Sequence, residues 1–410
     1  MKVLIVNTYD GGGGAAIAAR RLVLALKGAG VECGLLTIEN LGVPRWRRLW
    51  NKAWERCVIW VRNGFTKKNL WAVSIANSGF DITGTREFME ADVIHLHWVN
   101  HGLLSLRSLE KILASGKRVV WTMHDMWPLT SICHHARECE YYISGCNRCG
   151  FLRNGGTGLP GTKSLAAKVF ERKRGLFRDK GIRFVACSGW LGSLVKRSAL
   201  AVGNEVQVIP NPIDTGVFRV KDVDEARAAL GLPKERKLIL FGAAKVTDWR
   251  KGIDYFVEAC RLLCSLHPDI MDRWAVACYG GSSDALQELI PLKVHSLGFV
   301  RGEERLTDLY NAVSVFVTPS LEENLPNTIM EAMSCGTPCV GFNVGGIPEM
   351  IDHGKNGYVA EYKDASDLAA GMHWVLEEAD YGKLSVCARE KVTGCYSEEV
   401  VANKYINIYG

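Results

Sequence analysis

The sequence contains no run of about 18 uncharged apolar residues, which excludes a helix that spans a membrane. It also lacks an internal repeat and a low-complexity tail, so neither a repeat architecture nor a disordered extension is indicated. Met1 and Lys2 are followed directly by residues 3–6, which predict a strand, so we expect no signal peptide. The net charge of +6 is mild and does not by itself indicate binding to nucleic acid.

A chain of 410 residues is too long for a single hydrophobic core and suits two domains. Hydrophobic residues make up 48% and charged residues 23%, as in ordinary globular proteins. Cysteine is abundant, with 14 copies. Ten of them are scattered, mostly in apolar segments, as expected for small core residues in a reducing cytoplasm.

Short apolar runs alternate with helical patterns along the whole chain. The first set of predicted strands covers residues 2–7, 33–38, 92–97, 118–123, 183–187 and 206–210. The second set covers residues 237–242, 273–279, 294–298, 313–318, 338–342 and 357–360. Alternating strands and helices predict an α/β protein with parallel sheets that carry helices on both faces.

The pattern breaks at residues 210–214, where two prolines flank an asparagine and can continue neither a strand nor a helix. We therefore expect one domain over residues 1–209 and a second over residues 210–390. The remaining residues, 391–410, are predicted to end in a helix.

The most informative segment is residues 319–333, with the sequence PSLEENLPNTIMEAM. It joins a predicted strand to a predicted helix that starts near Pro326, so Glu323 lies in the loop and Glu331 lies about a turn and a half into the helix. Ligands of open α/β sheets bind at such strand ends, and helix N-termini attract phosphate. A sugar nucleotide offers both phosphate oxygens and hydroxyl groups for the two acids.

The string around these acids, from P-S before them through L-P-N to E-A-M-S-C-G-T-P, resembles the signature of retaining glycosyltransferases of family 4. That family has the GT-B fold, in which two Rossmann-like domains face a central cleft. The resemblance covers most of the chain and is strongest from residue 238 to 360. It implies transfer of a sugar from a UDP- or GDP-sugar to an acceptor hydroxyl with retention, without a catalytic cofactor or metal ion. It also implies that the C-terminal helix crosses back to the first domain.

The resemblance assigns roles to residues at the predicted donor site. Lys251-Gly252 matches a family K-G pair that neutralises the leaving diphosphate, while the usual arginine is replaced by Ala243; we assign its charge to Arg250 in preference to Lys245. Glu331 would hold the ribose and Glu323 the donor sugar, and His124, after the strand at 118–123, would orient that sugar. Further donor contacts are expected from backbone groups of Asn324, Leu325, Gly298 and Val300.

Four glycines follow the first predicted strand and open a helix over residues 17–26. The resemblance places this loop, with Gly12, Gly13, Gly14 and Arg20, beside the donor phosphate or the acceptor. The string also fits the G-x-G-x-x-A pattern of dinucleotide-binding proteins, although extra residues lengthen the turn and no acid is well placed for a ribose. A flexible turn without a ligand is the third interpretation.

Cys133, Cys139, Cys146 and Cys149 form a cluster in a polar insertion at residues 133–149. Four thiols at this density predict a structural zinc site, with the C-x-x-C pair as its knuckle. The irregular upstream spacing leaves disulfides and unliganded thiols as alternatives.

Residues 44–71 contain five tryptophans and eight basic residues, with Glu55 as the only acid. Trp46, Trp50 and Trp54 recur at every fourth position and so share one helix face. Tryptophans beside cations suit an anionic membrane surface, which predicts a protein held on the cytoplasmic face of the cell membrane and acting on a lipid-linked or glycan acceptor. The alternative is a helix that packs its tryptophans on the first domain. Nucleic acid is not an expected partner, because its binding would need basic residues over a larger surface.

Two other functions remain at this point. A sugar-nucleotide epimerase of the same fold would need no acceptor, and a non-catalytic sugar-nucleotide-binding protein would explain the missing arginine at Ala243. Asp222-Val223-Asp224 resembles the D-x-D metal motif of other glycosyltransferases, but its charged surroundings favour a solvated loop or a helix cap.

Overall fold

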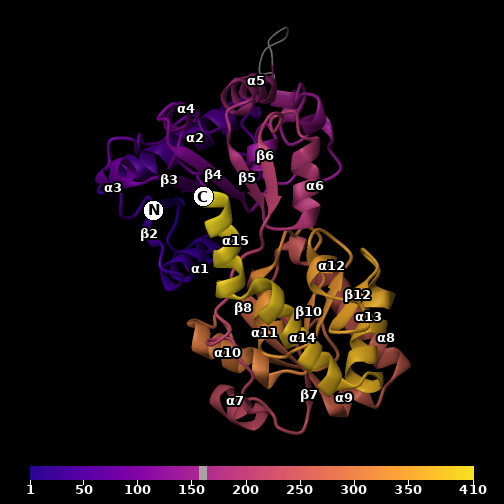
Figure 1. Ribbon diagram of the computed structural model, residues 1–410. Coiled ribbons are helices and arrows are strands. Elements are labelled where there is room, and N and C mark those ends of the chain that lie inside the picture. The colour runs from indigo at the N-terminus through magenta and orange to yellow at the C-terminus, as the bar shows by residue number, and fades with distance from the viewer. Residues whose placement is uncertain (157–163) are drawn as a thin grey trace. The chain divides into compact units, whose positions relative to one another are not determined.

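The computed structural model describes residues 1–156 and 164–410 and divides the chain into two compact units. Unit 1 comprises residues 1–211 together with 401–410, and unit 2 comprises residues 212–400. Figure 1 draws unit 1 mainly in indigo to magenta and unit 2 mainly in orange to yellow. In the described residues, each unit contains one six-stranded parallel sheet.

The sheet of unit 1 has the strand order β2-β1-β3-β4-β5-β6. Its strands are β1 (Lys2–Val6), β2 (Glu32–Leu36), β3 (Val93–Leu96), β4 (Arg118–Met123), β5 (Arg183–Ala186) and β6 (Glu205–Val208). The helices between them are α1 (Gly14–Gly28), α2 (Arg45–Arg62), α3 (Arg86–Glu90), α4 (Leu106–Leu113), α5 (Leu165–Phe177) and α6 (Gly189–Arg197).

The sheet of unit 2 has the strand order β12-β11-β10-β7-β8-β9. Its strands are β7 (Lys237–Lys245), β8 (Trp274–Gly281), β9 (Lys293–Ser296), β10 (Val315–Thr318), β11 (Cys339–Phe342) and β12 (Gly357–Ala360). Its helices are α7 (Val223–Leu230), α8 (Ile253–Leu266), α9 (Ile270–Arg273), α10 (Glu303–Ala312), α11 (Asn327–Ser334), α12 (Ile347–Met350), α13 (Ala365–His373) and α14 (Tyr381–Tyr396).

All twelve strands predicted from the apolar runs are present, so the two-sheet α/β prediction is confirmed. The runs are continuous because a parallel sheet covered on both faces buries every side chain of its central strands. In β10, all four residues are buried, and β3 and β11 show the same pattern. The D-x-D segment forms a helix cap, as expected, because the side chain of Asp222 accepts a hydrogen bond from the backbone N–H of Glu225 in α7.

Each sheet contains one point at which the strand order reverses. In unit 1 this point lies between β1 and β3, and in unit 2 it lies between β7 and β10. At such a point the loops that follow the two strands leave in opposite directions, and open α/β sheets bind their ligands in the space outside those strand ends.

The last helix, α15 (Glu398–Tyr409), belongs to unit 1 from Val401 onward. Its apolar residues pack in one cluster with Val3 and Ile5 of β1 and Val93 of β3. The hydroxyl of Tyr409 lies 2.7 Å from Nδ1 of His95. The helix therefore contributes directly to the core beside the first sheet.

Candidate active site

Two loops meet where the strand order of unit 2 reverses, one after β7 and one after β10. The backbone N–H of Leu321 donates a hydrogen bond of 2.7 Å to the carbonyl of Arg250. Gly252 has a φ of +70°, and a Cβ at this position would lie 1.8 Å from the carbonyl oxygen of Pro319. Only glycine fits there, so the Lys251-Gly252 pair is held tightly against the loop that carries Glu323.

The structure brings Lys251 and Glu323 together. The ammonium of Lys251 lies 2.6 Å from a carboxylate oxygen of Glu323, and both side chains are half-buried. Arg250 faces Asp248 instead, through a 2.6 Å bond from its guanidinium. The hydrogen bond from Arg250 to Asp248 raises the pKa of Arg250. A cation that can bind phosphate and an acid that can bind hydroxyls are thus adjacent at the strand ends.

Glu331 lies in α11 and is buried at 4% exposure. The hydroxyl of Tyr310, in α10, donates a 3.0 Å hydrogen bond to Glu331, and the hydroxyl of Tyr279, in β8, lies 3.3 Å from that of Tyr310. Burial raises the pKa of Tyr310 well above its usual value, so this phenol stays neutral and can donate. The two tyrosines fix one side of the carboxylate.

Neighbouring loops support the segment after β10. The backbone N–H of Gly346 donates to the carbonyl of Asn324 at 2.8 Å, and a Cβ at Gly345 would lie 1.9 Å from the carbonyl oxygen of Glu323. Asn324 and Leu325 are both buried. The backbone of Gly298 also accepts a hydrogen bond of 2.7 Å, from the N–H of Gly280.

Val300, the other predicted donor residue near Gly298, is half-buried and lies in the loop after β9. The predicted donor residues of unit 2 therefore all lie after strand ends: Arg250 and Lys251 in the short 3-10 helix Trp249–Lys251, Glu331 in α11, and the others in loops.

In unit 1, His124 directly follows β4. Its Nε2 lies 2.9 Å from Nδ1 of His97, and its Nδ1 lies 3.7 Å from the sulfur of Cys187. Burial lowers the pKa of His124 to about 4, so the imidazole is neutral at physiological pH. Asp125 points elsewhere, accepting a 2.8 Å hydrogen bond from the indole of Trp98.

The glycine-rich loop leads into α1, which begins at Gly14 after Gly13 as its N-cap. Gly12 has a φ of +85°, which a glycine adopts without strain. The first turn of the helix contains no acidic residue, and the cap provides no side-chain hydrogen bond. Arg20 lies on the exposed side of α1. The first backbone N–H groups of the helix suit an anion.

The structure gives the zinc prediction no support, and the four clustered cysteines stay a predicted site. In residues 1–156 and 164–410 no group of three or more His, Cys, Asp or Glu side chains is arranged to hold a metal ion. Cys133, Cys146 and Cys149 are free thiols buried in the core of unit 1, and Cys139 packs against that core. Burial raises the pKa of Cys146 to about 11, as expected for a thiol that packs as an apolar side chain.

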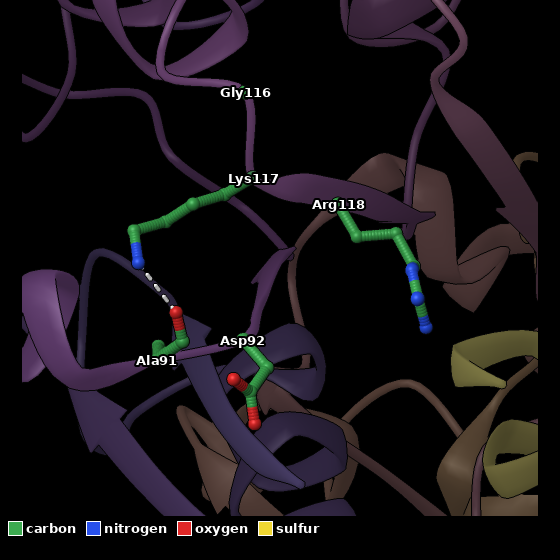
Figure 2. A pocket seen from close by; sticks show the side chains of 5 residues that line it. All are labelled: Ala91, Asp92, Gly116, Lys117 and Arg118. Atoms are coloured by element: carbon green, nitrogen blue, oxygen red, sulfur yellow. Dashed lines mark hydrogen bonds between the residues drawn. The ribbon is translucent and has the colours of Figure 1, made fainter.

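A pocket open to solvent lies at the amino-terminal ends of β3 and β4, opposite the carboxyl ends of the strands of the first sheet. Figure 2 shows its lining, in which the ammonium of Lys117 donates a 2.6 Å hydrogen bond to the carbonyl of Ala91. Asp92, Gly116 and Arg118 complete it. Because ligands of such sheets bind at the carboxyl ends of strands, we do not assign the reaction to this pocket.

Helix α2 buries two charged residues together with Ile59 and exposes most of its large apolar side chains. Glu55 is buried and accepts backbone hydrogen bonds from Ile75 and Ala76 at 2.7 and 2.8 Å. Arg56, also buried, lies 2.8 Å from Glu55 and donates to the carbonyl of Val73. The exposed large apolar residues of the same segment are Trp46, Leu49, Trp50, Trp54, Trp60, Val61, Phe65 and Trp71, and Arg45, Arg47, Lys67 and Lys68 are exposed beside them. The alternative in which the tryptophans pack on the domain is therefore wrong.

Two models of known protein families match this chain. The model of the family described as Glycosyltransferase Family 4 matches residues 12–217, half of the chain, and the model described as Glycosyl transferases group 1 matches residues 235–378. The chain belongs to glycosyltransferase family 4. The resemblance noted in the sequence is confirmed, and the protein is a glycosyltransferase.

Individual relatives agree with this assignment. The chain is similar to an uncharacterized glycosyltransferase of Methanocaldococcus jannaschii, 27% identical over 85% of this chain and 90% of the relative. It is 31% identical to a D-inositol 3-phosphate glycosyltransferase of Nocardiopsis dassonvillei over 45% of this chain, a match that spans only about half, 46%, of that relative.

The solved structure of Anabaena HepE in complex with UDP is similar in fold, with a TM-score of 0.60 and 15% identity, over 100% of this chain and 99% of HepE. Together with the two parallel sheets, such neighbours confirm the predicted GT-B fold.

Sequence reasoning missed several residues at both strand-order reversals. Tyr279 and Tyr310, which hold Glu331, come from two elements far from it in sequence. In unit 1, Tyr9 lies three residues after the end of β1 and Trp98 two residues after the end of β3, and their rings stack on each other. Their positions in the sequence could have indicated this, because aromatic residues that come shortly after two parallel strands lie at the same, carboxyl-terminal side of the sheet.

Proposed function

We propose that this glycosyltransferase moves a sugar from a UDP- or GDP-sugar to an acceptor hydroxyl with retention at the anomeric carbon and without a catalytic metal ion. The observation that carries the proposal is the Lys251–Glu323 ion pair, which stands where the strand order of unit 2 reverses. The UDP complex of HepE, which shares the fold, supports a nucleotide donor.

The ion pair suggests how the donor binds. Lys251 exchanges Glu323 for the diphosphate, and the released carboxylate accepts hydrogen bonds from hydroxyls of the donor sugar. Arg250 adds a second positive charge, and backbone amides near Asn324 and Leu325 hold phosphate oxygens. Glu331, held by Tyr310, accepts from the ribose hydroxyls.

The chemical step breaks the bond between the anomeric carbon and the phosphate oxygen and forms one to the acceptor oxygen on the same face. The acceptor proton passes to the leaving phosphate oxygen, so no separate general base is needed. Lys251 and Arg250 stabilise the negative charge that develops on the diphosphate. His124 orients the donor sugar as a neutral imidazole, in keeping with its lowered pKa.

We further propose that the protein acts at the cytoplasmic surface of the cell membrane on a lipid-linked acceptor in cell-surface polysaccharide assembly. No helix in the described part of the chain is long and apolar enough to cross a membrane. Helix α2 instead offers an exposed row of tryptophans with Arg45, Arg47 and neighbouring cations beside it. Indole rings favour the headgroup region, and the cations favour anionic lipid.

A thermal-shift screen against UDP, GDP and ADP tests the donor site. We expect one nucleotide to raise the melting temperature of the wild-type protein, because a ligand that binds only the folded state stabilises it. Glu331→Gln should weaken that nucleotide roughly 10-fold or more, since a charged hydrogen bond is worth about 1.5–3 kcal/mol. Lys355→Gln, at an exposed position just before the amino end of β12, is the matched control. No shift with any nucleotide would contradict the proposal.

Flotation with vesicles of phosphatidylglycerol and phosphatidylcholine tests the membrane face. The wild-type protein should float with vesicles rich in phosphatidylglycerol, and Trp50→Ser together with Trp54→Ser should abolish this. Trp249→Ser, at an exposed tryptophan of unit 2, is the control and should float like the wild type. Equal flotation of both variants would remove α2 from the proposal.

A further inference from the structure

A group of five side chains gathers where the strand order of unit 1 reverses. Tyr9 follows β1, Trp98 and His101 follow β3, Lys52 comes from α2, and Trp71 lies in the segment after that helix. We call these residues the aromatic–lysine cluster. None of them has a part in the donor site proposed above.

The aromatic rings of the cluster are in mutual contact. The rings of Tyr9 and Trp98 stack with their centroids 6.0 Å apart, and His101 meets Trp98 edge-on at 4.6 Å. His101 also meets Trp71 edge-on at 5.7 Å. Trp71 is 57% exposed, while Tyr9, Trp98 and His101 are half-buried. Aromatic carbon surface therefore reaches solvent at a strand end.

Within the described residues, Lys52 is a cation without a carboxylate partner. Its ammonium donates to the hydroxyl of Tyr9 at 3.3 Å and lies over the rings of Tyr9 and Trp71, 5.8 and 5.4 Å from their centroids. No acid of the described chain lies within 4.0 Å of it, whereas Lys251 and Arg250 each have one. A half-buried ammonium held by neutral groups is ready to bind an anion.

The cluster is fixed by hydrogen bonds between the loops after β1 and β3. The N–H of Thr8 donates to the carbonyl of Trp98 at 2.7 Å, and the N–H of Trp98 donates to the side-chain oxygen of Asn7 at 3.0 Å. The hydroxyl of Thr8 donates to the carbonyl of Asn100 at 2.7 Å. Such a surface loses little conformational entropy when a ligand binds.

Among the described residues, one polar atom of the cluster and one beside it are buried without a hydrogen-bond partner. Within the described residues, Nδ2 of Asn100 and Nε2 of His101 make no hydrogen bond. His101 also has a φ of +58°, which is uncommon for a residue other than glycine. Unpaired polar atoms and backbone strain are costly and tend to persist at binding sites.

We propose that the aromatic–lysine cluster is the acceptor subsite and that it takes a saccharide bearing a phosphate or diphosphate. The apolar face of a sugar ring packs on the aromatic surface, and the ammonium of Lys52 pairs with the phosphate. The glycine-rich loop, which begins two residues after Tyr9, adds backbone N–H groups. This inference rests on the proposed glycosyl transfer, because it names the acceptor of that reaction.

The anion can come from two sources, a lipid diphosphate or a soluble sugar phosphate. Lys52 lies on the half-buried side of α2, whose outer side carries the exposed tryptophans. A lipid-linked saccharide would meet both surfaces of one helix. A soluble sugar phosphate would meet Lys52 alone, so the two sources are separable by experiment.

The test is a titration followed by the indole resonances of the protein labelled with 15N-tryptophan, with the donor site saturated by the nucleotide that stabilises it. The probes are glucose 1-phosphate, methyl α-glucoside and citronellyl diphosphate-linked glucose. Trp71→Phe identifies the resonance of Trp71. We expect glucose 1-phosphate to shift that resonance and to bind about tenfold more weakly to Lys52→Gln. Lys180→Gln, at an exposed lysine of unit 1, should bind like the wild type.

The outcomes separate the inference from the proposed function. If no nucleotide binds, the glycosyl transfer itself fails. If the nucleotide binds but methyl α-glucoside matches glucose 1-phosphate, or Lys52→Gln changes nothing, the acceptor subsite is overturned while the donor site stands. Tighter binding of the citronellyl probe, lost in Trp50→Ser with Trp54→Ser, identifies the lipid source; equal binding of the two phosphate probes identifies the soluble one.

Discussion

At the scale of single residues, glycines determine how closely the loops of the donor site approach. Gly252 and Gly231 have nearly the same backbone conformation, with φ of +70° and +66°. A Cβ at Gly252 would collide with the backbone of Pro319, whereas one at Gly231 would meet nothing within 4 Å. An alanine would therefore meet the same backbone strain at both positions, and only at Gly252 would it also collide with a neighbouring loop.

This pair gives a matched prediction. Gly231→Ala should lower the free energy of unfolding by about 1–2 kcal/mol, the penalty of a left-handed residue. Gly252→Ala should lower it by about 1–3 kcal/mol more, because the loops after β7 and β10 must move apart. Urea unfolding measures both, and nucleotide binding should suffer only in Gly252→Ala. Equal losses of stability would show that the close approach to Pro319 does not matter.

Buried histidines of unit 1 predict a pH dependence. Burial, followed by the charge of Arg56, lowers the pKa of His101 to about 3, and burial lowers that of His95 to about 3 and of His124 to about 4. These groups stay neutral when folded but take up a proton near pH 6.5 when unfolded. Stability is therefore fully present above about pH 6.5 and is lost as the pH falls toward the folded pKa values.

His101→Asn tests this sign, since asparagine tolerates the left-handed conformation at this position. Between pH 7 and pH 5 the wild-type protein should lose about 2 kcal/mol of unfolding free energy for each such histidine, and the variant should lose correspondingly less. Denaturant unfolding at the two pH values measures the difference. A variant that loses as much as the wild type would show that His101 is not responsible.

At the scale of elements, α2 is informative because its neighbours in sequence have opposite environments. Glu55 is 1% exposed and bonds two backbone N–H groups and Arg56, whereas Trp54 is 46% exposed. Glu55→Ala should lower the unfolding free energy by about 3–5 kcal/mol, because it leaves a buried cation and two N–H groups unpaired. Trp54→Ala should change it by less than about 0.5 kcal/mol, as for other surface positions.

Thermal or urea unfolding of the two variants decides which face of α2 is buried. Glu55→Gln keeps a side-chain oxygen but removes the charge, so its loss of unfolding free energy should lie between those of Glu55→Ala and Trp54→Ala. If Trp54→Ala proved the more damaging substitution, the outward apolar face would not exist and the membrane proposal would lose its basis.

The orientation of α2 also shows how far the sequence could lead. The four-residue spacing of Trp46, Trp50 and Trp54 predicts a helix with one aromatic face, and that helix is present. The spacing alone does not decide which face is buried, because apolar faces usually turn inward, and only the basic neighbours of the tryptophans favour the outward orientation. The inward face is specified by hydrogen bonds from Ile75 and Ala76, which lie twenty residues away and become visible only in the folded chain.

The donor site shows the same limit: the sequence predicts where its residues lie along the chain, but not which of them are in contact. The runs of apolar residues and the turns after them are enough to predict that Glu323 and Lys251 follow strand ends. Their 2.6 Å contact also requires the strand order, which places β7 next to β10 and so joins two residues that are 72 positions apart in the chain. The tyrosines that hold Glu331 belong to the same category.

At the scale of the whole molecule, the chain returns to unit 1 at its C-terminal end. Val401, Tyr405 and Tyr409 of α15 are buried, and the hydroxyl of Tyr405 lies 2.8 Å from that of Thr122 in β4. Removal of residues 398–410 would uncover the apolar cluster beside β1 and β3.

A variant that ends at Ser397 should therefore lose the cooperative unfolding of unit 1, while unit 2 retains nucleotide binding. Limited proteolysis with mass spectrometry should place the early cuts within residues 1–211. Tyr409→Phe, which keeps the ring and removes only the hydroxyl, serves as a mild control. Unchanged protease resistance of the shortened chain would show that α15 is dispensable.

The most direct test of the whole proposal follows the sugar itself. The purified protein is incubated with vesicles that carry lipid-linked saccharides and with a radiolabelled sugar nucleotide of the base that stabilises it. We predict that label moves into the lipid fraction together with release of an equal amount of nucleoside diphosphate, and that Lys251→Gln slows this transfer about 100-fold or more. Release of an epimerised sugar without transfer, or equal transfer by Lys251→Gln, would contradict it.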